Sequence, residues 1–211
     1  MLIKKFKAEK YCNCFVVATE KAAVVIDPGV YSEELLDFFA ADQRQLLILL
    51  THRHFDHIGA AQQLRNETGA PIVIGQGDAD ALLDPDATLA TRFNQPIGPF
   101  TADILLDEEE TLRLGDLTIR AIPTPGHTAG GMCFLIGEHL FSGDILLPDK
   151  PAITRFPTGD PEAYLQTLRT LQTLNPDTLV YPGHGETTTL GYIYDNVVGS
   201  LLKQSAVVGS E

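Results

Sequence analysis

An apolar run followed at once by a cluster of histidines is the feature that most constrains the fold of this chain. Leu46–Leu50 is an unbroken aliphatic run, which is typical of a strand buried on both faces. Thr51–His57 follows directly and holds three histidines and one aspartate within six positions. A helix is expected over 58–68, because Gly69 is a helix-stopping residue. The histidines therefore lie in the turn after a buried strand, where a rigid scaffold presents side chains to a cleft.

The residue types in this turn are those that bind transition metals. Neutral imidazole and carboxylate are natural ligands for zinc, iron and manganese. In extended chain His52 and His54 point the same way, so they can share one metal. Asp56 and His57 follow at the bend and face a different direction. One ion does not readily take all four ligands, so the loop favours two adjacent ions. The alternative to a metal site is that ordinary polar residues gathered here by chance.

Composition and charge narrow the function classes. The 211 residues fit one domain spanning 1–211, with 44% hydrophobic and 20% charged residues. The formal net charge of -13 repels phosphate backbones, so we expect no nucleic-acid partner. We expect a small-molecule substrate, and the charge itself serves solubility. We expect no membrane association, since no apolar run of about 18 residues occurs. Three cysteines without a signal-peptide pattern predict reduced thiols and a cytoplasmic location. The sequence leaves the oligomeric state open.

Periodicity and turn residues divide the rest of the chain into alternating elements. Further strands are expected over 2–6, 14–18, 22–26, 71–74, 111–114, 117–122, 132–136, 139–142 and 178–181, and helices over 32–41, 161–174 and 190–203. The segment 75–102 is the least regular, with a helical turn expected over 78–83. A loop of this length is often a lid or wall of a binding site. Phe93 and Phe100 either line a pocket there or attach the loop to the core.

Three more candidate ligands lie at strand ends. His127 and His184 each follow a Pro-Gly pair, where glycine lets the backbone turn sharply and the side chain face inward. Asp144 follows a glycine in an equivalent place, and beside five histidines a carboxylate is the obvious group to bridge two cations. His139 follows a hairpin turn without such a setting, so we expect it to be exposed.

Four separated motifs carry a family resemblance. They are Thr-His-x-His-x-Asp-His, Pro-Gly-His-Thr, Ser-Gly-Asp and Pro-Gly-His-Gly, in this order. With Asp27-Pro28-Gly29 before the first helix, this pattern resembles the metallo-β-lactamase superfamily over nearly the whole chain. The resemblance implies an α/β fold, a four-layer αββα sandwich with its site along one edge. It also implies a ligand division: the first metal on His52, His54 and His127, the second on Asp56, His57 and His184, and Asp144 bridging.

Within the superfamily the chain is most similar to short glyoxalase II-like hydrolases, through Phe156–Pro161 and Thr188–Gly191. The relatives carry Gly-Arg-Thr-Asp just before the Phe-Pro-x-Gly segment, whereas this chain has Ala152–Arg155, and the helical extension that completes the glutathione site of full-length glyoxalase II is missing. Glutathione thioesters as substrates are therefore in question. Lys150 and Arg155 are candidates to hold a substrate anion, and Phe93 is a candidate substrate contact, while solvated surface charges are the plainer interpretation.

The resulting hypothesis is a binuclear metal-dependent hydrolase of a thioester. Two divalent ions would share a hydroxide that attacks the carbonyl carbon, and Asp56 would be the catalytic residue that orients this hydroxide. Zinc is the expected metal, with iron and manganese as alternatives. One alternative is a mononuclear-iron persulfide dioxygenase, which shares the fold and the first-site ligands. Hydrolysis of a lactone, a phosphoester or a β-lactam is another, since one site serves many substrates in the superfamily. The non-enzymatic alternative is a metal-binding domain without activity.

Overall fold

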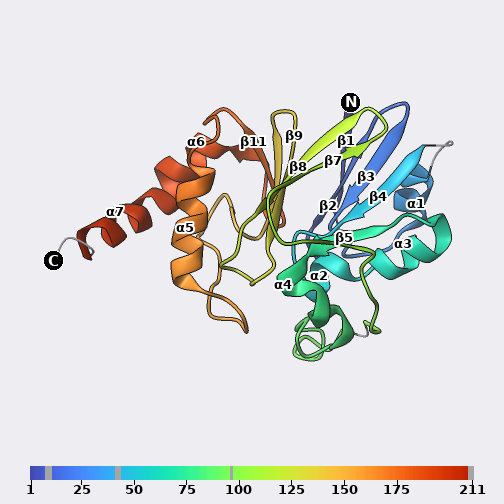
Figure 1. Cartoon of the computed structure of the whole chain (residues 1–211), viewed down its shortest axis with the longest axis horizontal. Coiled ribbons are helices and arrows are strands. Elements are labelled where there is room, and N and C mark those ends of the chain that lie inside the picture. The colour runs from blue at the N-terminus through green and yellow to red at the C-terminus, as the bar shows by residue number, and fades with distance from the viewer. Residues whose placement is uncertain (8–10, 41–43, 96, 209–211) are drawn as a thin grey trace.

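Two six-stranded β-sheets pack face to face, and helices cover the outer face of each (Figure 1). This computed structural model describes residues 1–7, 11–40, 44–95 and 97–208. The fold is the four-layer α/β sandwich that the family resemblance implies. Three apolar clusters fill the spaces between successive layers.

The first sheet follows chain order. Its strands are β1 (Leu2–Lys7), β2 (Asn13–Ala18), β3 (Ala22–Ile26), β4 (Gln45–Leu49), β5 (Ile72–Gly75) and β6 (Ile104–Leu106). β1, β2 and β3 pair antiparallel, and β3 to β6 pair parallel. The parallel half needs crossover helices, which are α1 (Glu33–Phe39), α2 (Phe55–Ile58), α3 (Ala61–Thr68) and α4 (Gln76–Ala79), with a 3₁₀ turn over Asp80–Leu83.

The second sheet has the spatial order β12-β11-β10-β9-β8-β7. Its strands are β7 (Glu110–Leu114), β8 (Leu117–Pro123), β9 (Met132–Ile136), β10 (His139–Gly143), β11 (Leu179–Pro182) and β12 (Thr188–Thr189). All neighbours pair antiparallel except β10 and β11, which run parallel. The outer helices are α5 (Pro161–Leu171), α6 (Leu190–Ile193) and α7 (Gly199–Val208), with a π-helical turn over Tyr194–Val198.

β4 shows why the apolar run predicts this architecture. Successive side chains of a strand point to opposite faces of the sheet. Ile48 and Leu50 enter the cluster under α1 and α3, whereas Leu47 and Leu49 enter the cluster between the two sheets. The apolar run Leu46–Leu50 therefore has no polar position to offer, and the candidate metal ligands lie in the turn that follows it.

Most of the elements expected from the sequence occur within a few residues of their expected bounds. Ser32 caps α1 by accepting from the Leu35 N–H, and Gly69 ends α3 with a φ of 72°. The expected helix over 58–68 corresponds to α3, which begins at Ala61, while Ile58 ends the separate short helix α2. The expected helix over 190–203 contains a π-helical turn. The end of the first expected helix, at 41, lies outside the described residues. β6 and β12 were missed, because three and two residues are too short for a periodic pattern.

His139 departs from expectation. It is partly buried, and its Nδ1 lies 3.0 Å from the Tyr181 hydroxyl on the neighbouring strand β11. The prediction that it is exposed was wrong, because the parallel β10–β11 pairing places an aromatic side chain beside it. Phe100 is buried in the core and attaches the 84–103 loop to it, whereas Phe93 is 48% exposed.

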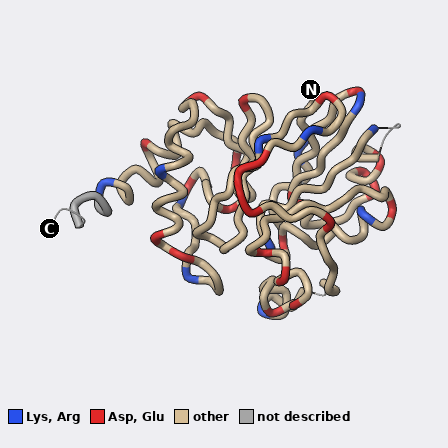
Figure 2. Tube along the Cα trace, in the orientation of Figure 1, with Lys and Arg blue, Asp and Glu red and all other residues tan. Residues whose placement is uncertain are grey.

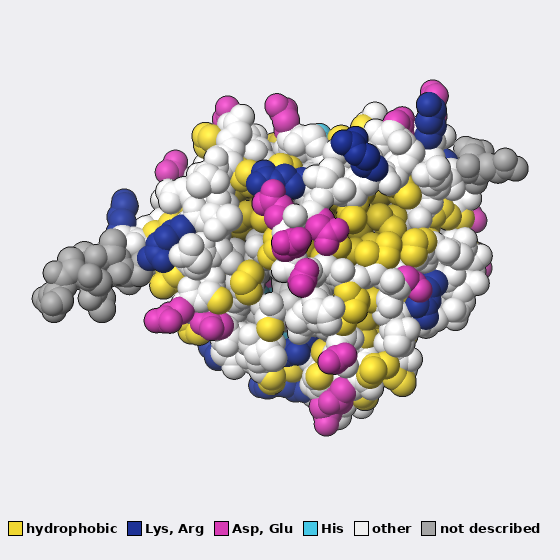
Figure 3. Space-filling view, viewed as in Figure 1, with side chains coloured by type: hydrophobic (Ala, Val, Ile, Leu, Met, Phe, Trp, Pro, Cys, Tyr) yellow, Lys and Arg dark blue, Asp and Glu magenta, His cyan; other side chains and the backbone are white. Residues whose placement is uncertain are grey.

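The surface carries the charge expected of an acidic chain. Figure 2 shows Asp and Glu spread over the chain, with a continuous acidic segment at Asp107–Glu110, before and into β7. On the face shown in Figure 3, acidic side chains lie beside a group of exposed hydrophobic ones, and Ile104 and Leu105 of β6 are exposed. Among the described residues, no helix has the length and apolar character needed to cross a bilayer.

Phe134 offers a test of the packing between the sheets. Its side chain is fully buried in the inter-sheet cluster, so Phe134→Ala should lower the free energy of unfolding by about 3–5 kcal/mol through lost burial and the cavity left behind. Urea denaturation of the metal-free protein, followed by circular dichroism, measures this. Leu83→Ala, at a position that is 53% exposed, is the control and should change stability by less than about 0.5 kcal/mol. Equal effects of the two changes would contradict this packing.

Candidate metal centre

The loop after β4 is held by a buried aspartate from the end of β3. Asp27 accepts from the Thr51 N–H at 2.7 Å and from the Thr51 hydroxyl at 2.6 Å. Its Oδ2 also lies 2.8 Å from His57 Nδ1. Asp27 has a φ of 51°, in the left-handed region that asparagine and aspartate tolerate best among non-glycine residues. Sequence analysis placed Asp27 in the family pattern but assigned it no role at the site. Because β3 and β4 pair in parallel, Asp27 at the end of β3 lies beside the histidine loop at the end of β4.

These contacts determine which nitrogen of each ring is free to bind an ion. The Thr51 hydroxyl proton goes to Asp27, so Thr51 accepts from His52 Nδ1, 3.0 Å away. His57 Nδ1 donates to the Asp27 carboxylate, and His127 Nδ1 donates to the Ile153 carbonyl at 2.7 Å, because a carbonyl can only accept. In all three rings Nδ1 thus carries a proton and Nε2 is the nitrogen that faces the cluster, where a metal would bind in place of a second proton.

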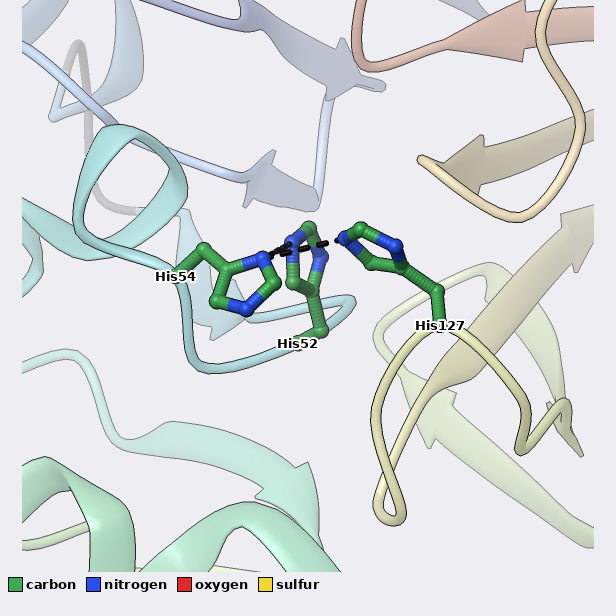
Figure 4. A group of neighbouring side chains, drawn as sticks. All are labelled: His52, His54 and His127. Atoms are coloured by element: carbon green, nitrogen blue, oxygen red, sulfur yellow. Dashed lines mark hydrogen bonds between the residues drawn. The ribbon is translucent and has the colours of Figure 1, made fainter. Parts of the chain in front are cut away.

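Three imidazoles converge on the first position (Figure 4). His52 Nε2 and His127 Nε2 each lie 3.0 Å from His54 Nδ1. His52 and His54 come from the loop after β4, and His127 comes from the loop after β8, on the opposite sheet. All three rings are buried. Three imidazole nitrogens at this separation can be satisfied together by one cation, as in a three-histidine catalytic site.

A second group of possible ligands lies beside the first. It consists of Asp56, His57 and His184, whose ligand atoms lie within 4.8 Å of one another. His184 Nε2 lies 3.1 Å from Asp56 Oδ2, and His57 Nε2 lies 3.7 Å from the same oxygen. His184 follows β11, so this group also draws on both sheets.

Asp144 lies between the two groups. Its Oδ1 is 3.4 Å from His57 Nε2 and 3.6 Å from His184 Nε2. Its Oδ2 is 3.8 Å from His127 Nε2 in the first group. One carboxylate oxygen thus faces each group, which is the arrangement that a bridging ligand requires.

The unsatisfied atoms of the cluster fit bound cations. His57 Nε2 and Asp144 Oδ1, 3.4 Å apart, are two of the five buried side-chain atoms of the described residues that make no hydrogen bond, and His54 Nε2 is a third. Burying such groups without a partner is costly, and a cation between them would remove that cost. The donor set of imidazole nitrogens and carboxylate oxygens suits zinc, iron or manganese.

Burial and mutual charge give three of these groups the protonation states of ligands. Burial, followed by repulsion from His127 and His57, lowers the pKa of His54 to about 3. Burial also holds the pKa of His52 well below its usual value. For Asp144 burial raises the pKa, but the attraction of His57 outweighs it and the net pKa is lowered. His52 and His54 are therefore neutral and Asp144 ionised near pH 7, as metal binding requires.

His57 is the exception among these groups. Burial lowers the pKa of His57, but attraction to Cys12 and to the nearby aspartates outweighs this and holds the pKa well above its usual value. An ion at this position would therefore displace a proton from the ring.

A second buried carboxylate, Asp78, joins the two loops of the first group. It accepts from the Arg53 N–H at 3.1 Å, from the Thr128 hydroxyl at 2.7 Å and from the Gly130 N–H at 3.0 Å. Arg53 lies between His52 and His54 in the chain, and Thr128 follows His127. Asp78 was missed because it lies in the segment that looked irregular from the sequence, where a carboxylate usually faces solvent.

The predicted substrate contacts lie on the two loops that flank the cluster. Phe93 stacks on Phe55, next to Asp56, with ring centroids 5.0 Å apart. Lys150 and Arg155 are exposed, and they are not part of the metal cluster.

Sequence analysis missed two further side chains at the site. The ring of Phe156 packs edge-on against His54, with centroids 5.8 Å apart. Arg92 lies over that ring, with its Cζ 5.5 Å from the centroid. A cation and an aromatic ring thus lie beside the first group of ligands.

Comparison with known sequences places this arrangement among metal-dependent hydrolases. The sequence profile of the metallo-beta-lactamase superfamily matches residues 8–184. Hydroxyacylglutathione hydrolase GloC of Haemophilus influenzae is 37% identical over 187 residues, which cover 85% of this chain and 88% of that protein. The probable polyketide biosynthesis zinc-dependent hydrolase BaeB of Bacillus velezensis is 30% identical over 176 residues, covering 82% and 72%.

Solved structures agree with this placement. BLEG-1 B3 metallo-beta-lactamase superposes with a TM-score of 0.84 at 32% identity, covering 92% of this chain and 97% of that one. TTHA1623 in a di-iron-bound form gives 0.76 at 32% identity, covering 93% and 98%. ETHE1 from Myxococcus xanthus gives 0.73 at 28% identity, covering 92% and 82%. The profile match spans most of the chain and the fold is shared, so this protein belongs to the metallo-β-lactamase superfamily.

Proposed function

We propose that this protein is a binuclear metal-dependent hydrolase that cleaves a thioester. The observation that carries the proposal is Asp144, with one carboxylate oxygen toward each of two groups of metal-type ligands. The ions would lie on His52, His54 and His127 and on Asp56, His57 and His184, with Asp144 between them. Bound there, two divalent ions would lower the pKa of a water toward about 7 and polarise a carbonyl oxygen.

The residues of the chain would orient the reactants. Asp56 is largely buried but keeps 16% of its side chain exposed, so it can bind at the second position and still face an entering water. Burial raises the pKa of Asp56, but attraction to His57 and a hydrogen bond from His184 outweigh this, and the net pKa is lowered. Asp56 therefore stays an acceptor near pH 7, able to orient the water that attacks the carbonyl carbon.

The ionised carboxylates also bear on the leaving group. With lowered pKa values, neither Asp56 nor Asp144 carries a proton to donate near pH 7. A thiol of pKa about 8.5 leaves readily as a thiolate, whereas an amide nitrogen requires protonation. This favours a thioester over a β-lactam, although a B3 metallo-beta-lactamase shares the fold. The similarity to a hydroxyacylglutathione hydrolase supports the same choice.

Phe93, Lys150 and Arg155 are proposed to meet the substrate. Lys150 and Arg155 are cations on an exposed loop of an acidic protein, which suits them to attract an anionic group. Phe93 offers an exposed aromatic face, supported from behind by Phe55. We expect the functional location to be the cytoplasm, because all three cysteines are free and buried.

A mononuclear-iron dioxygenase acting on persulfides is the second candidate. The trio His52, His54 and His127 is complete without the second group, so it can hold one ion by itself. The similarity to TTHA1623, which was solved in a di-iron-bound form, shows that a related scaffold takes iron.

Metal content separates the two candidates. We expect protein purified without chelator to hold two equivalents of divalent metal, measured by inductively coupled plasma mass spectrometry. Removal of the metal should abolish thioester hydrolysis and lower the melting temperature, because an ion at 100 times its Kd stabilises the folded state by about 2.7 kcal/mol. One iron per chain, with oxygen consumption on a persulfide, would instead favour the dioxygenase.

Asp144→Asn tests the hydrolase itself. The change keeps the shape of the side chain but removes the charge that faces both groups, so kcat/KM on the best thioester of a panel should fall by more than about 100-fold, with metal restored. His139→Ala is the control, because that histidine lies outside the cluster and contacts Tyr181. Turnover by the Asn variant at the level of the control would refute the hydrolase proposal. The panel should include lactones, phosphodiesters and a β-lactam, whose preferred cleavage would replace the thioester.

A further inference from the structure

His184 has the least packing support of the proposed ligands. Its side chain is 38% exposed, compared with 6% for His127 and 0% for His57. It lies in the short loop between the end of β11 at Pro182 and the start of β12 at Thr188. A half-exposed ring on a surface loop needs some other constraint to stay at a fixed distance from its partners.

That constraint comes from Asn13, on the opposite sheet. Asn13 begins β2 and is 3% exposed. Its backbone N–H donates to the Gly183 carbonyl at 2.6 Å. Its side-chain Nδ2 donates to the Pro182 carbonyl and to the Gly185 carbonyl, each at 2.9 Å. One residue of the first sheet thus hydrogen-bonds three carbonyls that lie on both sides of His184, in the loop after β11 of the second sheet.

The bound loop lies directly against the rest of the cluster. The Gly183 N–H donates to the Gly143 carbonyl at 2.8 Å, next to Asp144. A Cβ at Gly183 would lie 2.5 Å from Asp144 Oδ1 and 2.5 Å from His57 Cε1. The backbone of this loop therefore has no room to move inward, and Asn13 prevents it from moving outward.

A neighbouring lysine cannot replace Asn13. Lys5 Nζ lies 3.4 Å from the Gly185 carbonyl and 3.2 Å from Glu186 Oε2, and its side chain is 26% exposed. A pair this exposed contributes little, because solvent screens it and the long side chain loses freedom. Asn13 is buried, so its two amide protons have no water as an alternative partner.

We propose that Asn13 is a positioning residue for the second metal position, acting through His184. The inference rests on the two-metal function proposed above. Its contacts with the cluster run through the Pro182–Gly185 loop, whereas the loops that carry the first group are joined by Asp78. Loss of the Asn13 side chain should therefore weaken binding of the second ion and leave the first in place.

The test compares two asparagine variants by metal binding. Asn13→Asp keeps the shape of the side chain but replaces the donating Nδ2 by an oxygen that cannot donate to the Pro182 and Gly185 carbonyls. Asn196→Asp is the matched control. Asn196 is exposed, lies in the π-helical turn Tyr194–Val198 outside the cluster, and also donates through Nδ2 to a carbonyl, that of Tyr192 at 2.8 Å. Metal-free proteins are dialysed to equilibrium against graded free Zn²⁺, and bound zinc is counted by mass spectrometry.

We expect the wild type and Asn196→Asp to bind two zinc ions per chain. Asn13→Asp should bind the first ion with unchanged affinity and the second about 10- to 100-fold more weakly, the usual effect of losing a group that orients a metal ligand. Excess zinc should restore the second ion. Circular dichroism before and after dialysis checks the fold, and Asn13→Ser, which keeps one donor, replaces the Asp variant if that one does not fold.

The outcomes are distinct. Unchanged binding of both ions by the Asn13 variant, or equal weakening of both, would overturn the positioning role while leaving the two-metal proposal intact. A wild type that binds a single zinc ion at saturation would overturn both, because there would be no second position for Asn13 to support.

Discussion

The burial of several polar side chains in one small volume is the constraint on which this structure depends. His52, His54 and His57 are almost completely removed from solvent, within a few ångströms of Asp144. Buried polar atoms without partners are destabilising, and a cation between the rings would satisfy the atoms that face one another. His54 Nε2 has no hydrogen-bond partner among the described residues, whereas His52, His57 and His127 are hydrogen-bonded on their far sides to residues behind them.

Those residues form a layer behind the ligands. Asp27 orients His57 and, through Thr51, His52, while the Ile153 carbonyl orients His127. Asp78 and Asn13 hold the loops instead of the rings. The layer is assembled from both sheets, and parallel strands make this easy, because the carboxyl ends of β3 and β4, and of β10 and β11, meet at one edge.

The local sequence indicates the candidate ligands and gives little signal for the supporting layer. Thr51–His57 follows an apolar strand, and His127, His184 and Asp144 follow glycines at strand ends, so a short pattern singles out seven candidate ligands, whose side chains lie together in the structure. Asn13 lies between two buried cysteines and gives no such signal. Its partners lie about 170 positions away, and only the packing of one sheet on the other brings them within 2.9 Å. β6 gives no signal either, because its three residues are too short for a periodic pattern and become a strand only by pairing with β5.

This division explains how one centre can serve different substrates in related proteins. Apart from the partly exposed His184, the candidate ligands and their supporting residues are largely buried at one edge of the sandwich, where most changes would leave a polar group unpaired. Phe93, Arg92 and Phe156 lie on the exposed loops in front of it, where replacement disturbs little of the core. Hydroxyacylglutathione hydrolase GloC and BLEG-1 B3 metallo-beta-lactamase are similar to this chain at 37% and 32% identity, and exposed front loops are the place where substrate contacts can differ without unpairing a buried polar group.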